Sequence, residues 1–272
     1  MALVPFKGGA QPAPYDDDDP EDLERDDEAA GGKMSFLEHL DELRRRLVVS
    51  LVAVLSGFLA ALFFIDRIFA FVMKPLQEIL PHGGKLIYTE PTEAFMLQLK
   101  VAALAGLVVA APVVMWQVWL FVAPGLYSRE KRFALPFVFF STAFFVGGAA
   151  FSHYVVFPTA WAFLASYTTE YMEFTPKVSS TFSLYSRMLL AFGLVFQMPT
   201  VIFALARMGV VTAGFLARNV KYAVLIIFIV AAVITPTSDI VTQTMMAAPM
   251  MVLYGLSIII AWIFGKKKPR NL

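Results

Sequence analysis

The sequence contains no cysteine and little charge. Without cysteine, neither a disulfide framework nor a thiolate metal site can form. Only 16% of the 272 residues are charged, whereas 58% are hydrophobic and the mean hydropathy is +0.68. A soluble domain of this length carries more charge and less apolar surface. The composition therefore argues against an ordinary soluble protein and predicts one whose main solvent is the lipid bilayer.

Histidine is scarce as well, and motifs of catalysis are missing. The three histidines, His39, His82 and His153, lie in different segments, and no H-E-x-x-H, P-loop or G-x-S-x-G sequence occurs. We therefore expect no enzymatic activity, no metal site and no cofactor. His153 lies in an apolar segment between Ser152 and Tyr154. It is predicted to be a hydrogen-bonded packing residue rather than a ligand.

The charge that is present is unevenly distributed. Ten of the 21 acidic residues fall between Asp16 and Glu28. Because residues 1–33 have so few apolar side chains, we expect a disordered, acidic cytoplasmic tail. Residues 266–272 form a short basic cytoplasmic tail. The remaining residues, 34–265, are predicted to form one membrane domain.

Six apolar runs divide this membrane domain. We therefore predict an all-α, polytopic membrane protein with six transmembrane helices, of which the fifth and sixth are short. The fifth run has only 13 residues, below the ~20 that a helix needs to cross the hydrocarbon core. A re-entrant hairpin over residues 222–264 is the alternative for this end. The runs are Leu47–Ile65, Val101–Ala123, Phe133–Phe157, Met188–Ala206, Tyr222–Ile234 and Met245–Phe264.

The distribution of Lys and Arg between the runs predicts the orientation. One side carries thirteen cations and the other six, and the richer side is expected to be cytoplasmic, which places both termini inside. The outer side then holds loops 66–98 and 168–187. Within the first of these, apolar spacing predicts a helix over residues 68–80, and a second short helix is expected from Thr92, with Glu93 in its first turn.

Three charged or polar stretches stand out beside the spans. The first, S-F-L-E-H-L-D-E-L-R-R-R-L at residues 35–47, places Glu42 four residues before Arg46, where an ordinary i,i+4 pair is the simplest explanation. The second, residues 119–132, sets Glu130 among three cations. The third, residues 235–243, contains Asp239, which can simply cap a helix.

Together these stretches resemble a known family. H-L-D-E-L-R-R-R at 39–46, F-V-A-P-G-L-Y-S-R-E-K-R at 121–132 and T-P-T-S-D-I-V-T-Q at 235–243 match signature segments of the TatC family. F-P at 157–158 and F-G-L-V-F-Q-M-P at 192–199 match two more, in the same order and at similar spacing. The resemblance extends from residue 34 to about residue 264.

The resemblance implies a receptor for twin-arginine signal peptides in the bacterial cytoplasmic (inner) membrane. Such a receptor forms an oligomer with TatB-type subunits, works with TatA-type subunits and exports folded proteins using the proton motive force, without an enzymatic step or a nucleic-acid partner. Both single-span partners would contact the fifth and sixth helices. The matched positions assign signal-peptide binding to Glu42, Glu130 and Phe121, and functional polar roles to Asp239 and Gln243.

One position departs from the family. TatC proteins usually have Glu in the middle of the fourth span, where this chain has Gln197. An amide can form hydrogen bonds but cannot carry a proton, so a proton relay through this position is not expected.

Two other functions remain open on the residues alone. A small-molecule or ion transporter would line a polar path with Gln197, Asp239 and Gln243, but the absence of an internal repeat argues against it. An intramembrane hydrolase would need a nucleophile facing a base, and we find no such pair.

Overall fold

The computed structural model describes residues 36–79, 86–122, 134–171, 174–235 and 239–265. Within these ranges every regular element is a helix, and the one pairing of extended chain is an isolated bridge between Ile87 and Lys177. The chain divides into two compact units, residues 1–44 and 45–272. The predicted tails, 1–33 and 266–272, lie outside the described residues.

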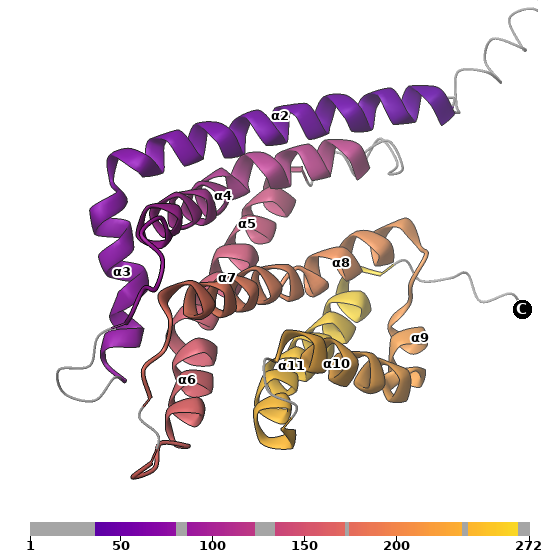
Figure 1. The fold of residues 1–272 in the computed structure, drawn as a ribbon. Helices are drawn as coiled ribbons and strands as arrows, with labels where there is room; N and C mark the ends of the chain where they lie inside the picture. The colour runs from indigo at the N-terminus through magenta and orange to yellow at the C-terminus, as the bar shows by residue number, and fades with distance from the viewer. Residues whose placement is uncertain (1–35, 80–85, 123–133, 172–173, 236–238, 266–272) are drawn as a thin grey trace, which may run out of the picture. The chain divides into compact units, whose positions relative to one another are not determined.

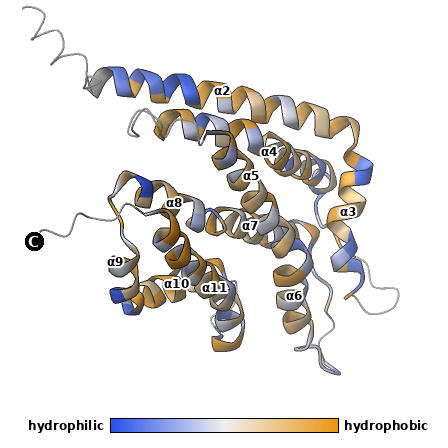
Figure 2. Cartoon of the chain, turned by 180° about the vertical axis from the view of Figure 1, so that it is seen from behind, coloured by the Kyte–Doolittle hydropathy of each residue, from blue (hydrophilic) through white to orange (hydrophobic). Residues whose placement is uncertain are grey.

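Among the residues that the structure describes, five helical stretches are long and apolar enough to cross a membrane. Two are composite, because α5 (Ala134–Phe151) continues through η3 (Ser152–Val156) into α6 (Phe157–Ala165), and α7 (Val178–Val195) continues into α8 (Met198–Met208). They have 25 to 31 residues, so at ~1.5 Å per residue each exceeds the ~30 Å hydrocarbon core. Hydrophobic residues dominate them (Figure 2). The other three are α2 (Phe36–Phe63), α4 (Glu93–Val122) and α11 (Ile240–Phe264).

A sixth apolar helix, α10 (Val220–Ile234), completes the predicted set. It has 15 residues and rises only ~22 Å, so the short fifth span is confirmed. A six-residue helix, α9 (Ala213–Arg218), precedes it, and Figure 1 shows α10 beside α11.

Two expectations about helix ends are wrong. The sixth span is not short, because α11 begins at Ile240, ahead of the apolar run from Met245, and has 25 residues. The Asp239 side chain caps this earlier start. No separate short helix begins near Thr92 either, because Glu93 opens the long helix α4 directly. The predicted outer helix is present as α3 (Ile65–Gln77), which packs against α4 and α6.

Proline explains why two of the spans are composite. Proline cannot donate a backbone hydrogen bond, and its ring collides with the carbonyl group of the preceding turn. Before Pro158 the third span widens into the π-helix η3, and before Pro199 the fourth span breaks between α7 and α8. Both irregular turns carry polar side chains, which makes them the places in these spans where directional bonds can form.

The core of residues 45–272 is built around α7. The side chains of Tyr185, Met188 and Phe192 are at most 1% exposed and pack with Phe157 and Trp161 of α6. Elements α4, α5 and η3 contact the same helix. The most buried of the composite spans is therefore also the one that holds the other helices together.

Candidate functional site

The predicted signal-peptide residues lie at helix ends. Glu42 is half-buried near the start of α2, within residues 36–44 of the first unit. Phe121 is half-buried one residue before the end of α4. Glu130 lies outside the described residues. The pairing of Glu42 with Glu130 at one recognition site therefore stays a prediction.

Gln197 occupies the break in the fourth span. It is 8% exposed, and its Nε2 donates a hydrogen bond of 2.8 Å to the carbonyl oxygen of Ser141 in α5. A buried amide in an apolar span needs such a partner. An unsatisfied polar group costs several kcal/mol in the hydrocarbon of a bilayer, and ~1–3 kcal/mol in a protein interior. In the structure Gln197 ties the third and fourth spans together.

The two polar residues at the start of the sixth span also have structural partners. Asp239 Oδ1 accepts a 2.7 Å hydrogen bond from the backbone nitrogen of Thr242, which is the capping role that the sequence allowed. Gln243 Nε2 donates to the carbonyl oxygen of Phe228 in α10 at 2.9 Å. Since Gln197 bonds to α5 and Gln243 to α10, these amides do not share a hydrogen-bonded path.

His153 is a packing residue, as predicted. It is 3% exposed, and its Nδ1 shares a 2.9 Å hydrogen bond with the hydroxyl group of Tyr185 in α7. Its ring stacks on Phe71 of α3, with the centroids 4.3 Å apart. Within the described ranges, no three His, Asp or Glu side chains gather as a metal site requires.

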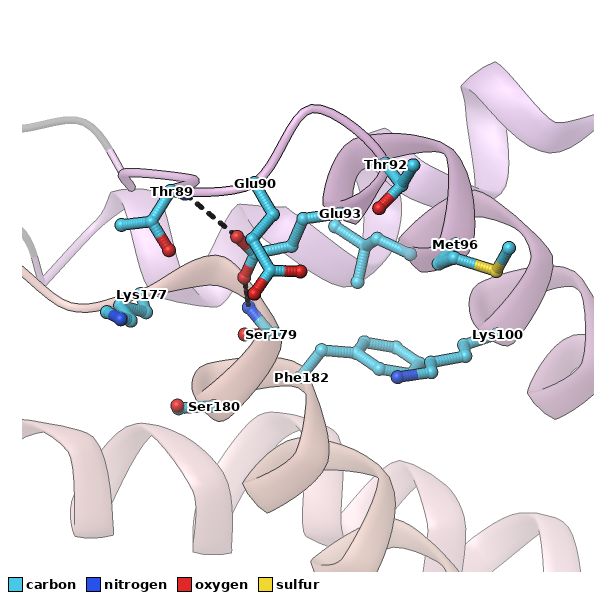
Figure 3. A pocket seen from close by; sticks show the side chains of 11 residues that line it. Thr89, Glu90, Thr92, Glu93, Met96, Lys100, Lys177, Ser179, Ser180 and Phe182 are labelled. Carbon is cyan, nitrogen blue, oxygen red and sulfur yellow. Dashed lines mark hydrogen bonds between the residues drawn. The ribbon is translucent and has the colours of Figure 1, made fainter.

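Glu93 joins the two outer loops by hydrogen bonds, a contact that the sequence did not predict. Figure 3 shows its carboxylate between both loops: Oε2 accepts from the backbone nitrogen of Thr89 at 2.9 Å and Oε1 from that of Ser179 at 3.1 Å. The backbone nitrogen of Val178 also donates to the carbonyl oxygen of Ile87 at 3.0 Å. The starts of α4 and α7 are thereby fixed side by side, and both line a hollow of about 360 Å³.

Only the position of Glu93, and not its partner Ser179, could be predicted from the sequence nearby. A carboxylate in the first turn of a helix is recognisable from sequence. Its second partner, Ser179, is 86 residues away and was not predictable from local pattern.

Comparisons with known proteins decide among the functions that the residues left open. The family model described as Sec-independent protein translocase protein (TatC) matches residues 38–249. The chain belongs to the TatC family. A TatC of Koribacter versatilis is 44% identical over 88% of this chain and 89% of its own length. One of Desulforapulum autotrophicum is 47% identical, with 87% of each chain covered.

Solved TatC structures have the same fold. A crystal structure described as the twin-arginine translocase receptor TatC superimposes with a TM-score of 0.72 at 36% identity, covering 82% of this chain and 98% of that chain. A second, determined in DDM, gives 0.73 at 37% identity. The predicted family is thus confirmed. As a TatC, the chain is a multi-pass component of the Sec-independent protein translocase and not an enzyme, which sets aside the hydrolase and solute-transporter alternatives.

Proposed function

We propose that this chain is the subunit that recognises twin-arginine signal peptides before folded proteins are exported. The observation that carries the proposal is its similarity to the twin-arginine translocase receptor, 98% of which the chain covers. The recognition chemistry is assigned to Glu42 and Glu130, two carboxylates close to clusters of arginine and lysine, and to Phe121, which lies in the same sequence stretch as Glu130.

Carboxylates suit this ligand. A guanidinium group offers a fixed fork of N–H donors, which a carboxylate accepts in two parallel, charge-assisted hydrogen bonds. Two consecutive arginines therefore call for two carboxylates, one each. Such pairs are stronger at a membrane interface than in bulk water, because the effective dielectric constant is lower. The neighbouring arginines and lysines anchor the chain to anionic lipid.

The decisive experiment measures binding of a twin-arginine signal peptide and of its twin-lysine variant to the purified full-length protein. Glu42→Gln and Glu130→Gln are each expected to weaken binding of the arginine peptide about ten- to a hundredfold, from the ~1.5–3 kcal/mol of a charged hydrogen bond. Both variants lose much of the preference for arginine. Asp41→Asn, which removes an exposed carboxylate one residue from Glu42, serves as the matched control and keeps wild-type binding. Unchanged affinity and selectivity in both Gln variants would assign recognition elsewhere.

The orientation is part of the proposal. The thirteen-to-six distribution of cations supports a cytoplasmic position, at the bacterial inner membrane, for both termini, for the 1–33 and 266–272 tails and for the recognition residues. A reporter that is active only outside the cytoplasm should work when fused within residues 80–90 or 170–180. It should be silent near residue 128 or 268, and the opposite pattern would reverse the orientation.

TatB-type and TatA-type single-span subunits are proposed as partners, with the proton motive force as the energy source. The fifth span offers them a surface, because Ile226, Ile229 and Val233 of α10 are 55–72% exposed while Ile227 is 3% exposed. Since the chain has no cysteine, a single introduced one reports its own contacts. Ile229→Cys should crosslink to a cysteine in a partner helix, and Ile227→Cys should not. Crosslinking from neither position would move the partner surface away from α10.

A further inference from the structure

A second hollow lies between α4 and α7 and has no role in the proposed receptor function. It is an open groove of about 530 Å³, and its lining residues all belong to these two helices. Lys100 and Arg187 line it together with Ser183, and the rest of its wall is mainly apolar, including Leu107 and Leu190. The groove therefore combines a cationic part with an apolar part.

The two cations lie at the same depth. Glu93 holds the start of α4 against the start of α7 by its bond to Ser179. Lys100 follows Glu93 by seven residues and Arg187 follows Ser179 by eight, which correspond to rises of ~10 and ~12 Å along helices that run in the same direction. Leu107 and Leu190 come later in each helix, so the apolar part of the wall extends from the cations toward the middle of the membrane.

Both cations stand at the edge of the hydrocarbon region. An uncharged stretch begins directly after each, at Val101 in α4 and at Met188 in α7. Both side chains are exposed, and neither forms an ion pair or a hydrogen bond with any residue that the structure describes. Lys100 also lines the first hollow, together with Glu90 and Glu93, and the Glu93 carboxylate is bonded to backbone nitrogens. Charged side chains at this depth are costly unless an anion or water compensates them.

We propose that this hollow binds an anionic phospholipid, with the phosphate group between Lys100 and Arg187 and an acyl chain along Leu107 and Leu190. The Ser183 hydroxyl group can add a hydrogen bond, whereas that of Ser186 already donates to the Ser183 carbonyl oxygen. Assignment to the outer leaflet rests on the orientation proposed above, but binding itself does not.

The chemistry of the hollow favours a lipid over other occupants. A free phosphate ion would leave the apolar wall uncovered, while a zwitterionic lipid would bring its own cation beside two others. The arginine end of a signal peptide would be repelled by Lys100 and Arg187. An anionic lipid matches both parts of the wall. Its headgroup is attracted by each cation near the membrane surface, and its acyl chain covers the apolar part.

The test is native mass spectrometry of the purified, delipidated full-length chain titrated with phosphatidylglycerol or phosphatidylcholine. We expect phosphatidylglycerol to bind more tightly, and Lys100→Ala/Arg187→Ala to weaken its binding about thirtyfold. The matched control, Arg67→Ala/Lys74→Ala, removes the same charge from exposed positions of α3 and should bind as wild type. Equal affinity for the two lipids, or an equal loss in the control, would overturn the proposal.

A second pair of variants separates the site from general folding effects. Lys100→Arg/Arg187→Lys keeps both charges and should retain lipid, whereas Leu107→Trp fills the apolar part without changing charge and should lose it. If Leu107→Trp binds as wild type, the acyl chain does not lie in this hollow. Displacement of phosphatidylglycerol by excess inorganic phosphate would show an ion site and would also refute the lipid. Signal-peptide binding should be unchanged in every variant, so failure here leaves the receptor function intact.

Discussion

Helices α2 and α7–α8 are equally good spans by sequence, yet they are packed very differently. Only 11% of the apolar stretch of α2 is buried within the chain, compared with 44% of that of α7–α8. Leu47, Leu51, Leu55 and Leu59 recur every four residues along α2 and are all at least 52% exposed. In water such a stripe would be a defect, but lipid tails are as apolar as leucine. Hydropathy therefore predicts that a helix crosses the membrane and not what it contacts there.

The contact of α2 with α4 includes a very close crossing of the two backbones. A Cβ atom on Gly57 would lie 2.6 Å from the carbonyl oxygen of Gly106 in α4, and one on Gly106 would collide with the backbone nitrogen of Phe58. Only a pair of glycines allows backbones to approach this closely. The packing of α7 is spread over many large side chains, whereas the buried residues of α2 are the small Gly57 and Ala61.

The largest effect is expected from Phe192→Ala in α7. The Phe192 side chain is fully buried and packs on the ring of Phe151, with the centroids 5.8 Å apart. Truncating a buried phenylalanine creates a cavity and costs ~3–5 kcal/mol. Thermal unfolding of the purified protein in detergent should show a large fall in melting temperature. A small change would mean that α7 is not the helix that holds the core together.

A methyl group at Gly106 tests the close crossing. We expect Gly106→Ala to destabilise by ~1–3 kcal/mol, because its Cβ meets backbone atoms that cannot rotate away. Gly147→Ala in α5 is the matched control, since a Cβ there meets nothing within 4 Å. Alanine is the better helix former by ~1 kcal/mol, so the control should be neutral or stabilised. Similar melting temperatures for both variants would show that α2 can move away at no cost.

Local patterns predicted the elements well. The six spans, the outer helix α3, the packing role of His153 and the TatC family are all confirmed by the structure or the comparisons. Each depends on features within one segment, such as an apolar run or a signature motif. The length of the sixth span was wrong because apolarity alone marks where lipid begins, whereas the Asp239 cap decides where the helix begins.

Contacts between distant segments were not predictable. Nothing near Gly57 indicates Gly106 as its neighbour, and nothing near Glu93 indicates Ser179. The two cations of the α4–α7 hollow were counted only as loop charges, because their shared depth depends on how the helices start. The candidate recognition site remains a sequence prediction, since Glu130 lies outside the described residues.

An intermediate effect is expected at Gln197. Gln197→Leu removes the donor to the Ser141 carbonyl oxygen and should cost ~0.5–1.5 kcal/mol, with impaired export. Gln197→Glu keeps a polar group of the same size and should retain export. Export of a folded reporter and the melting temperature should be measured for both variants. A fully active Leu variant would show that Gln197 only fills space and that its hydrogen bond is not needed for export.

The smallest effect is expected from Leu55→Ala in α2. Its side chain is 55% exposed, so truncation exchanges contacts with lipid and leaves no cavity within the chain. The loss should be ~0.5 kcal/mol or less, as for other exposed substitutions. Leu55→Lys distinguishes lipid from water as the surroundings, because a lysine at the centre of a span costs ~2.5–3.5 kcal/mol on an insertion scale, whereas in water it would cost almost nothing. We therefore expect the Ala variant to have the melting temperature of the wild type, and the Lys variant to insert poorly into the membrane. Should Leu55→Ala lower the melting temperature as much as Phe192→Ala, this face of α2 would have to be covered by protein, and the contrast between the two spans would fail.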